Sequence, residues 1–187
     1  MSRIQLPAPE SVPEKSKPIL EKVGKRLGLT PNLFTLVSIS PASLTALDHL
    51  QTTLGRTLDA KTRDRIHIMV GEVNGCDYCV SAHTWLGAKL NKLTEEDMEL
   101  NRQGHSTDPM ADVAVNFAHK IAVNRGHVTT ADVDAVRAAG YTDADIVDIV
   151  TTTAFSFMTN FFNLVADVEI DATFPVIHTH HTARAGA

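Results

Sequence analysis

The strongest constraint on the fold is a repeated pattern of capping residues followed by apolar residues at helical spacing. The segment that begins at Ser40-Pro41 shows it clearly: a capping serine and a proline precede Leu44, Leu47 and Leu50. Proline suits the first helical position because its missing N–H would have no partner there. Apolar residues three apart lie on one face of a helix. This pattern predicts a helix with one buried face.

The same pattern recurs along the whole chain. Two β-branched runs, 34–40 and 146–153, resemble strands, but each follows a helix cap and neither is bounded by hairpin turns, so both are interpreted as helical. Thr30 and Pro31 are expected to be the cap and first residue of one helix. We therefore predict an all-α, multi-helix bundle in one domain spanning 1–187, with an N-terminal arm at about 1–12 and an irregular tail at about 171–187. The expected helical segments are 13–28, 30–40, 40–55, 59–73, 76–93, 94–104, 108–126, 129–140 and 142–165.

Composition limits the possible partners. The chain has 187 residues, of which 43% are hydrophobic and 21% charged, and its net charge is −5. These values are typical of a globular protein and argue against binding to nucleic acid or an anionic membrane. No run of eighteen apolar residues predicts a membrane-spanning helix. The N-terminal residues contain no apolar signal-like stretch, so we expect a cytoplasmic location.

The two cysteines lie in the segment EVNGCDYCVSAH, residues 72–83, and no others occur in the chain. A cytosolic protein keeps its thiols reduced, so the pair does not indicate a structural disulfide framework. A bridge between Cys76 and Cys79 closes so short a loop that its entropic contribution is only roughly 2 kcal/mol. The pairing is better explained by chemistry than by stability.

A helix that begins near Cys76 aligns three reactive side chains. Cys76, Cys79 and His83 then share one stripe, with the cysteines one turn apart. The N-terminus of a helix stabilises a thiolate, which favours Cys76 as the more acidic thiol, whereas the neighbouring imidazole favours Cys79. His83 can accept or relay a proton, and Glu72 and Asp64 are the carboxylates that could orient it or take the proton onward. The stripe therefore predicts a redox or proton-transfer site.

CDYCVSAH after NG resembles the CxxCxxxH site of the AhpD-like alkylhydroperoxidases in the carboxymuconolactone decarboxylase superfamily. RDRIHIMVGEVNGCDYCVSAHTWLG, GYTDADIVDIV and TNFFN extend the resemblance to the peroxidase-related branch, over roughly residues 15 to 170. It implies an all-helical fold, assembly as trimers or hexamers, and no bound cofactor. It also implies that Cys79 attacks the hydroperoxide, Cys76 resolves the disulfide, and His83 relays the proton. A thiol or dithiol reductant is the implied second substrate.

One departure from the family pattern concerns the carboxylate. The family usually has a glutamate twelve residues before the first cysteine, where this chain has Asp64. Aspartate is one methylene shorter, so Glu72 is a candidate to share its role. Lactone decarboxylases generally lack the dithiol, so the resemblance points away from decarboxylation.

Other interpretations of the same residues stay open at the level of sequence. Zinc could bind Cys76, Cys79 and His83, with His67 or a histidine of IHTHHT as the fourth ligand. In that case the protein is a non-catalytic helical oligomer that binds zinc or senses redox state. Two inert, buried cysteines are a third possibility. A thioredoxin-type motif is not favoured, because it requires a strand–helix–strand setting.

Several further residues attract attention without a clear role. His67 could join the proton relay, and Tyr78, inside the CxxC, could line the site or simply pack. Asn160 and Asn163 interrupt an otherwise apolar helix and could bridge helices or edge a pocket. Residues 129–150 resemble a helix-turn-helix, but three aspartates on its second helix would repel phosphates.

From the stripe of Cys76, Cys79 and His83 and from the family resemblance, we predict a thiol-dependent hydroperoxide reductase or disulfide oxidoreductase acting in antioxidant defence.

Overall fold

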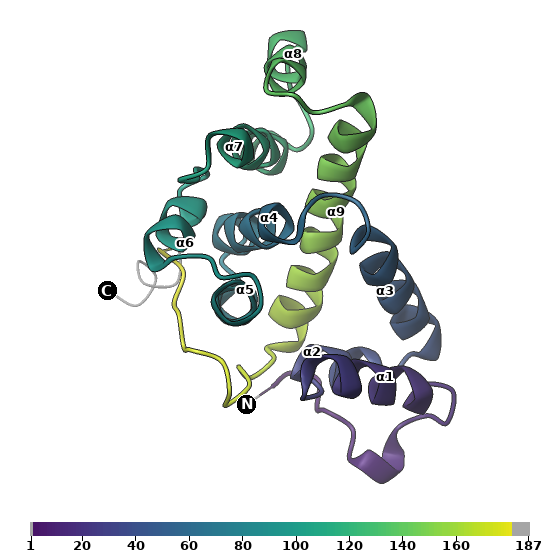
Figure 1. Cartoon of the computed structure of the whole chain (residues 1–187). Helices are drawn as coiled ribbons and strands as arrows, with labels where there is room; N and C mark the ends of the chain where they lie inside the picture. The colour runs from purple at the N-terminus through teal and green to yellow at the C-terminus, as the bar shows by residue number, and fades with distance from the viewer. Residues whose placement is uncertain (1, 181–187) are drawn as a thin grey trace.

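The computed structural model describes residues 2–180 and is all-helical, with no strand in that range (Figure 1). The all-α prediction is confirmed. A short 3₁₀ turn at Pro9–Ser11 precedes the α-helices. These are α1 (Lys17–Leu27), α2 (Asn32–Val37), α3 (Pro41–Leu54), α4 (Ala60–Val73), α5 (Asp77–Lys89), α6 (Glu95–Arg102), α7 (Pro109–Val123), α8 (Thr130–Ala138) and α9 (Asp143–Ala166).

Helix α4 lies at the centre of the bundle. It packs against α5, α6, α7 and α9 (Figure 1). Residues on different sides of α4, among them Ile66, Ile68 and Met69, have no solvent exposure. A helix that is apolar on several sides is typical of the interior of a bundle. This central position makes α4 the support for the elements around it.

Two apolar cores flank α9. Ile149 of α9 packs with α4, α7 and α8 in one core, whereas Phe155 packs with α1, α2 and α3 in the other. Figure 1 shows α9 running from α8 past α4 and α5 towards the N-terminal helices. The two cores therefore share one long helix, and the candidate site lies beside its C-terminal half.

The helix caps match most of the sequence predictions. Ser40 caps α3 through its side chain, and Thr129 and Thr142 form capping boxes at α8 and α9. The strand-like run 146–153 is helical throughout, in α9, and the run 34–40 is helical as far as Val37, where α2 ends. The prediction at Thr30-Pro31 is wrong: Pro31 occupies the cap position, and α2 begins at Asn32.

The α2 cap comes from a distant residue. Pro31 has no side-chain acceptor, and the Asn32 N–H donates instead to the Asp171 carboxylate, 3.1 Å away. A carboxylate at a helix N-terminus satisfies a free N–H and opposes the positive end of the helix. The chain after α9 therefore completes a helix near the start of the sequence.

Helix α9 modifies the sequence-based expectation about membranes. By length and composition it could cross a membrane, because an 18-residue window has a mean hydropathy of 1.3. Half of that window is buried inside the bundle. Its packing between two cores accounts for this apolar character.

The segment after α9 is irregular, as predicted, but it is docked on the bundle. It returns past α5 to α6 (Figure 1), where Arg102 donates to the His178 carbonyl at 3.0 Å. On the way, the Ile177 N–H donates to Ser81 Oγ at 3.0 Å, and Thr179 binds the Asp77 carboxylate. The remaining part of the predicted tail, 181–187, lies outside the described residues.

Candidate active site

A tight turn between α4 and α5 builds the site. The Cys76 N–H donates to the Gly71 carbonyl at 2.8 Å, and the Gly75 N–H to the Glu72 carbonyl at 3.1 Å. These two bonds form a Schellman motif, which requires a left-handed residue at Gly75, where φ is 68°. Glycine adopts that conformation without steric cost. The chain therefore reverses at once and starts α5 at the first cysteine.

Cys76 is the cap residue of α5. Its Sγ accepts the backbone N–H of Cys79 at 3.3 Å. The predicted helix start near Cys76 is confirmed. Cys79 lies in the first turn, so both sulfurs are close to the positive end of the helix.

The two cysteines are joined as a disulfide, with Cα atoms 5.3 Å apart. Both are buried, at 1% exposure for Cys76 and 4% for Cys79. Only Cys79 lines the neighbouring cavity. A molecule in that cavity therefore meets the second sulfur of the pair, with the first behind it.

His83 is oriented by Asp64. Its Nδ1 lies 3.0 Å from Asp64 Oδ1, and the Asn91 side-chain amide donates to the other carboxylate oxygen. An ionised carboxylate only accepts hydrogen bonds, so His83 carries its proton on Nδ1 in this contact. The Nε2 atom of the neutral ring is left as a base. Aspartate thus reaches the histidine directly, despite being one methylene shorter than glutamate.

Glu72 has different partners. Arg102 Nε donates to Glu72 Oε2 at 2.7 Å, and the His180 backbone N–H donates to Oε1 at 2.7 Å. His180 Nδ1 is 3.1 Å from the same oxygen. These contacts attach α6 and the C-terminal segment to α4. Of the two predicted carboxylates, the structure brings Asp64 to His83 and directs Glu72 to this second cluster.

A second histidine stacks on the first. The rings of His67 and His83 are 4.2 Å apart between centroids and 17° from parallel. Ser156 Oγ lies 2.6 Å from His67 Nδ1 and donates its one proton to the Thr152 carbonyl. Ser156 therefore accepts from His67 Nδ1, which leaves Nε2 of His67 as a free acceptor.

His67 is held in the neutral form. Burial lowers its pKa well below 6.5, and the nearby His83 and Arg63 lower it further. A neutral ring avoids repulsion when its stacked neighbour accepts a proton. The pair can therefore hold one positive charge, on His83, beside the dithiol.

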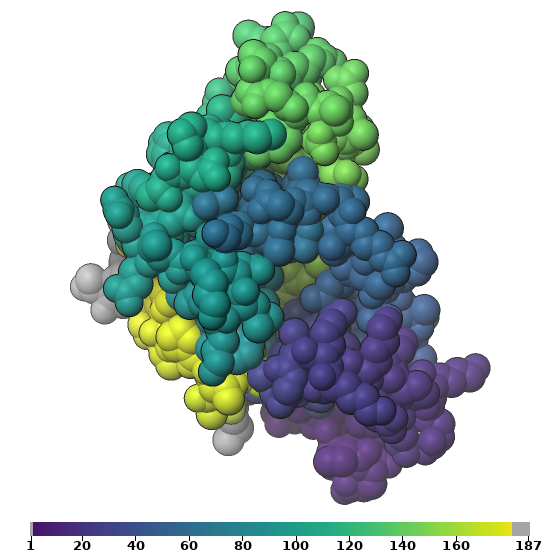
Figure 2. All heavy atoms as spheres, in the orientation of Figure 1, coloured from purple at the N-terminus to yellow at the C-terminus, as the bar shows by residue number. Residues whose placement is uncertain are grey.

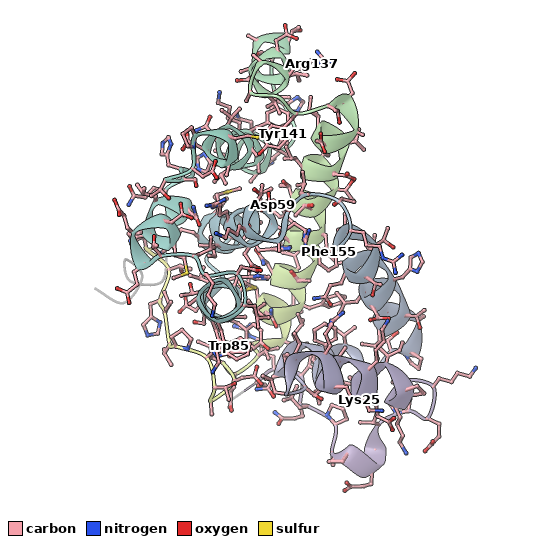
Figure 3. The ribbon with its side chains drawn as sticks, in the orientation of Figure 1. Lys25, Asp59, Trp85, Arg137, Tyr141 and Phe155 are labelled. Atoms are coloured by element: carbon pink, nitrogen blue, oxygen red, sulfur yellow. A yellow bond between two sulfur atoms is a disulfide. The ribbon has the colours of Figure 1, made fainter. Side chains whose placement is uncertain are left out.

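A cavity of about 160 Å³ opens beside Cys79 and both histidines. Figure 2 shows a hollow between α1 and α5, with part of α9 visible at its floor. In Figure 3, Trp85 lies on α5 and Phe155 on the side of α9 that faces α3. The wall of the cavity is mainly apolar, and the lining residues include Leu29, Leu33, Phe34, Leu47, Trp85, Phe155 and Phe174.

The C-terminal segment closes one side of this cavity. Phe174 packs against Trp85, with ring centroids 5.4 Å apart, and edge-on against Tyr78. Tyr78 donates its hydroxyl proton to Asp171 at 2.7 Å. Tyr78, which the sequence left between lining the site and packing, therefore forms part of the cavity wall together with Trp85.

Asn163 is the contact that sequence reasoning left unassigned. Its Nδ2 donates to Cys79 Sγ at 3.3 Å, from a side chain that is 4% exposed. Asn160 instead accepts from Asn74 Nδ2 at 2.8 Å, so it ties α9 to the turn before Cys76. The sequence signal was the polar interruption of an apolar helix, which does not reveal the partner.

The donor arrangement does not match a zinc site. Within residues 2–180, no group of three or more His, Cys, Asp or Glu side chains is placed to hold a metal ion. Cys76 and Cys79 are joined as a disulfide, so neither sulfur is a thiolate ligand in this state. Tetrahedral zinc needs four converging ligands. The zinc interpretation of the sequence therefore gains no support from this geometry.

Comparison with known families gives one match. Residues 41–119 match the carboxymuconolactone decarboxylase family. The matched range runs from the start of α3 into α7 and includes both cysteines, His83 and Asp64. No significant match was found among curated proteins.

Similar solved structures extend over nearly the whole chain. A peroxidase-related protein from Silicibacter sp. TM1040 is 25% identical, with a TM-score of 0.81 over 92% of this chain and 93% of its own. An AhpD-core, peroxidase-related protein from Ralstonia eutropha JMP134 is 24% identical, with a TM-score of 0.81 over 91% and 93%. The debrominase Bmp8, in complex with 2,3,4-tribromopyrrole, shares the fold at 16% identity and a TM-score of 0.75, over 90% and 91%.

Proposed function

Since this chain is an AhpD-like member of the carboxymuconolactone decarboxylase superfamily, we propose that it is a thiol-dependent hydroperoxide reductase. Its Cys76–Cys79 pair would cycle between dithiol and disulfide at the expense of a thiol or dithiol reductant. The observation that supports this most directly is the position of Cys79 on the cavity wall beside His83, with Cys76 bonded behind it. A reducing compartment such as the cytoplasm would supply the reductant.

The first step is attack on the hydroperoxide. His83 Nε2 takes the Cys79 thiol proton, and the thiolate attacks the terminal oxygen of ROOH. The O–O bond breaks, Cys79 becomes a sulfenic acid, and the leaving alkoxide takes the proton from His83 to give ROH. Asp64 stabilises the imidazolium that forms between these transfers.

The second step closes the disulfide. The Cys76 thiol attacks the Cys79 sulfenic acid, which forms the S–S bond and releases one water. An external dithiol then reduces the bond and is itself oxidised to a disulfide. The oxidised product has the covalent state seen in the structure. No bound cofactor enters this cycle.

Access to the cavity supports the different roles of the two cysteines. Each sulfur accepts one hydrogen bond, from a backbone N–H for Cys76 and from Asn163 for Cys79. The hydrogen bonds alone therefore do not distinguish them. Access does, because only Cys79 lines the cavity.

Single-cysteine variants test the proposal. Cys76→Ser should consume one equivalent of hydroperoxide and stop at a sulfenic acid that can be trapped by a dimedone reagent. Cys79→Ser should consume hydroperoxide only at the background rate. Consumption by Cys79→Ser but not by Cys76→Ser would reverse the assignment, and equal consumption by both would abolish it. A parent protein inactive towards several hydroperoxides would refute the function.

The alternative is a non-catalytic protein that senses redox state or binds zinc. Its zinc-binding form predicts stoichiometric zinc in the freshly purified, reduced protein, and both forms predict no turnover with hydroperoxide and dithiothreitol. Metal analysis and thiol titration on one sample distinguish the two functions. Turnover with two free thiols per chain and no zinc supports the reductase.

Assembly with further copies of the chain is part of the proposal. The outer face of α9 carries Val147, Val150, Phe161 and Val165, each more than 40% exposed. Their spacing places them on one side of the helix. Apolar faces of this kind are commonly covered by another subunit. A trimer or hexamer is the expected state.

A further inference from the structure

We propose that Asn163 is a catalytic residue that stabilises the Cys79 thiolate, an inference that rests on the proposed thiol chemistry. Asn163 comes from α9, 84 residues after Cys79 in the chain. Its Nδ2 lies 3.3 Å from Cys79 Sγ in the oxidised protein. After reduction the same N–H group would face the thiolate. A hydrogen bond to a charged acceptor is stronger than one to a neutral acceptor.

The burial of Asn163 supports a role at the sulfur rather than in packing. Its Oδ1 is buried and has no hydrogen-bond partner among the described residues. A buried, unpaired acceptor lowers stability, so an apolar side chain of similar size would suit this place in a core better. Asn160 is buried nearby on the same helix, but its Oδ1 is paired with Asn74. Only Asn163 both lacks a partner for its oxygen and contacts the reactive sulfur.

The proposal separates two tasks within the site. His83 changes its charge as it takes and returns a proton, whereas the Asn163 amide stays neutral and only donates. Because the amide does not titrate, it donates to the sulfur whatever the protonation state of His83. It therefore lowers the pKa of the Cys79 thiol independently of the histidine. Stabilising the thiolate also makes it a weaker nucleophile, because nucleophilicity falls with thiol pKa.

Other ionisable groups on the surrounding elements also influence the pKa of Cys79, so a test of Asn163 must leave them unchanged. They include His67, Asp64 and Glu72 on α4, Asp77, Tyr78 and His83 on α5, and Asp171 on the C-terminal segment. Helix α9 contributes only uncharged side chains to the cavity wall, including Thr159 and Asn163. A substitution at Asn163 therefore leaves these ionisable groups in place.

The test uses the Cys76→Ser background, in which Cys79 is the only thiol. The rate of alkylation by iodoacetamide, measured from about pH 5 to about pH 10, gives the Cys79 pKa. Replacing Asn163 by Leu should raise this pKa by about one unit, which leaves about tenfold less thiolate below the pKa. Asn163→Asp, which keeps the size of the side chain, should raise it further because a negative charge then faces the sulfur.

The shape of the pH profile distinguishes this role from a purely structural one. Below the pKa, Asn163→Leu should react more slowly than the parent. Above the pKa, Cys79 is ionised both in the parent and in the variant. There the variant should react about threefold faster, because its thiolate is the stronger nucleophile. A structural defect would change the access of the reagent to the buried thiol and would shift the rate in the same direction at both ends. The two profiles should therefore cross.

The control is Asn160→Leu, which removes a buried amide from the same helix that does not contact the sulfur. It is expected to lower stability and to leave the Cys79 pKa unchanged. Unchanged pKa values in both Asn163 variants, or an equal shift in the control, would overturn the proposal. Asn163→Asp provides the test if Asn163→Leu does not fold. A parent protein without peroxidase activity refutes the proposed function, whereas the alkylation profiles still decide the contact with Asn163.

Discussion

Removal of the Tyr78 hydroxyl should destabilise the cavity wall, where this hydroxyl joins three segments of the chain. This hydroxyl donates to Asp171 at 2.7 Å and accepts the Leu33 N–H at 3.1 Å. Asp171 in turn caps α2 through the Asn32 N–H. One oxygen atom therefore joins α5, the start of α2 and the C-terminal segment. Tyr78→Phe deletes that atom and leaves the ring in place.

The expected loss follows from the two bonds. The bond to the carboxylate contributes about 1.5–3 kcal/mol, and a buried N–H left unpaired costs about 1–3 kcal/mol. Asp171 and Leu33 are only half-buried, so water replaces part of both. We expect Tyr78→Phe to lower the free energy of unfolding by about 2–3 kcal/mol. Burial and the Asp171 charge hold the Tyr78 pKa far above 10, so the loss should not vary between neutral and mildly alkaline pH.

Urea denaturation of the oxidised protein measures this loss as a shift of the midpoint at constant slope. Tyr141→Phe is the matched control, because Tyr141 is the only other tyrosine and donates one bond, to the Met110 carbonyl at 3.2 Å. The control should lose about 1 kcal/mol. A loss below about 0.5 kcal/mol for Tyr78→Phe would refute the view that this hydroxyl joins the three segments.

Three further predictions follow from burial and packing. The pKa of His67 is lowered in the folded protein, so as pH falls below about 6.5 the unfolded chain takes up a proton at His67 while the folded protein does not. This difference reduces the free energy of unfolding by up to about 1.4 kcal/mol for each pH unit below about 6.5. His67→Gln should weaken that dependence between about pH 7.5 and about pH 5.5 in urea titrations, and an unchanged slope would contradict the neutral assignment. Phe161→Asp, on the exposed face of α9, should reduce the particle mass measured by light scattering, whereas a monomeric parent would disprove assembly through that face. Gly71→Ala places a Cβ 3.0 Å from Val80 Cγ2 and 3.3 Å from the Val80 backbone nitrogen, so α5 must shift; we expect a loss of about 1–3 kcal/mol, and unchanged stability would show that the helix pair tolerates the shift.

The sequence by itself determined the elements of this fold. Caps such as Ser40 and Thr142 and the spacing of apolar residues depend on neighbours within one or two helical turns. They therefore act before any tertiary contact exists. The turn at Gly75 and the start of α5 at Cys76 are equally local. Local interactions also placed Cys76, Cys79 and His83 on adjacent turns of one helix.

Only the tertiary structure decided which carboxylate meets the histidine. Asp64 and Glu72 both lie on α4, eight residues apart, and both were reasonable partners. Helices α4 and α5 form a hairpin whose turn precedes Cys76, so residues far from the turn on α4 face residues far from it on α5. Asp64 therefore lies opposite His83, whereas Glu72, close to the turn, meets Arg102 and the C-terminal segment.

The same holds for contacts between distant segments. Asn163 reaches Cys79 across 84 residues, and Asp171 caps α2 across 139. At the sequence level Asn163 was only a polar interruption, and Asp171 only the start of an irregular tail. Periodicity identifies the buried side of a helix but not the element that covers it, because that choice depends on how all the buried faces pack together.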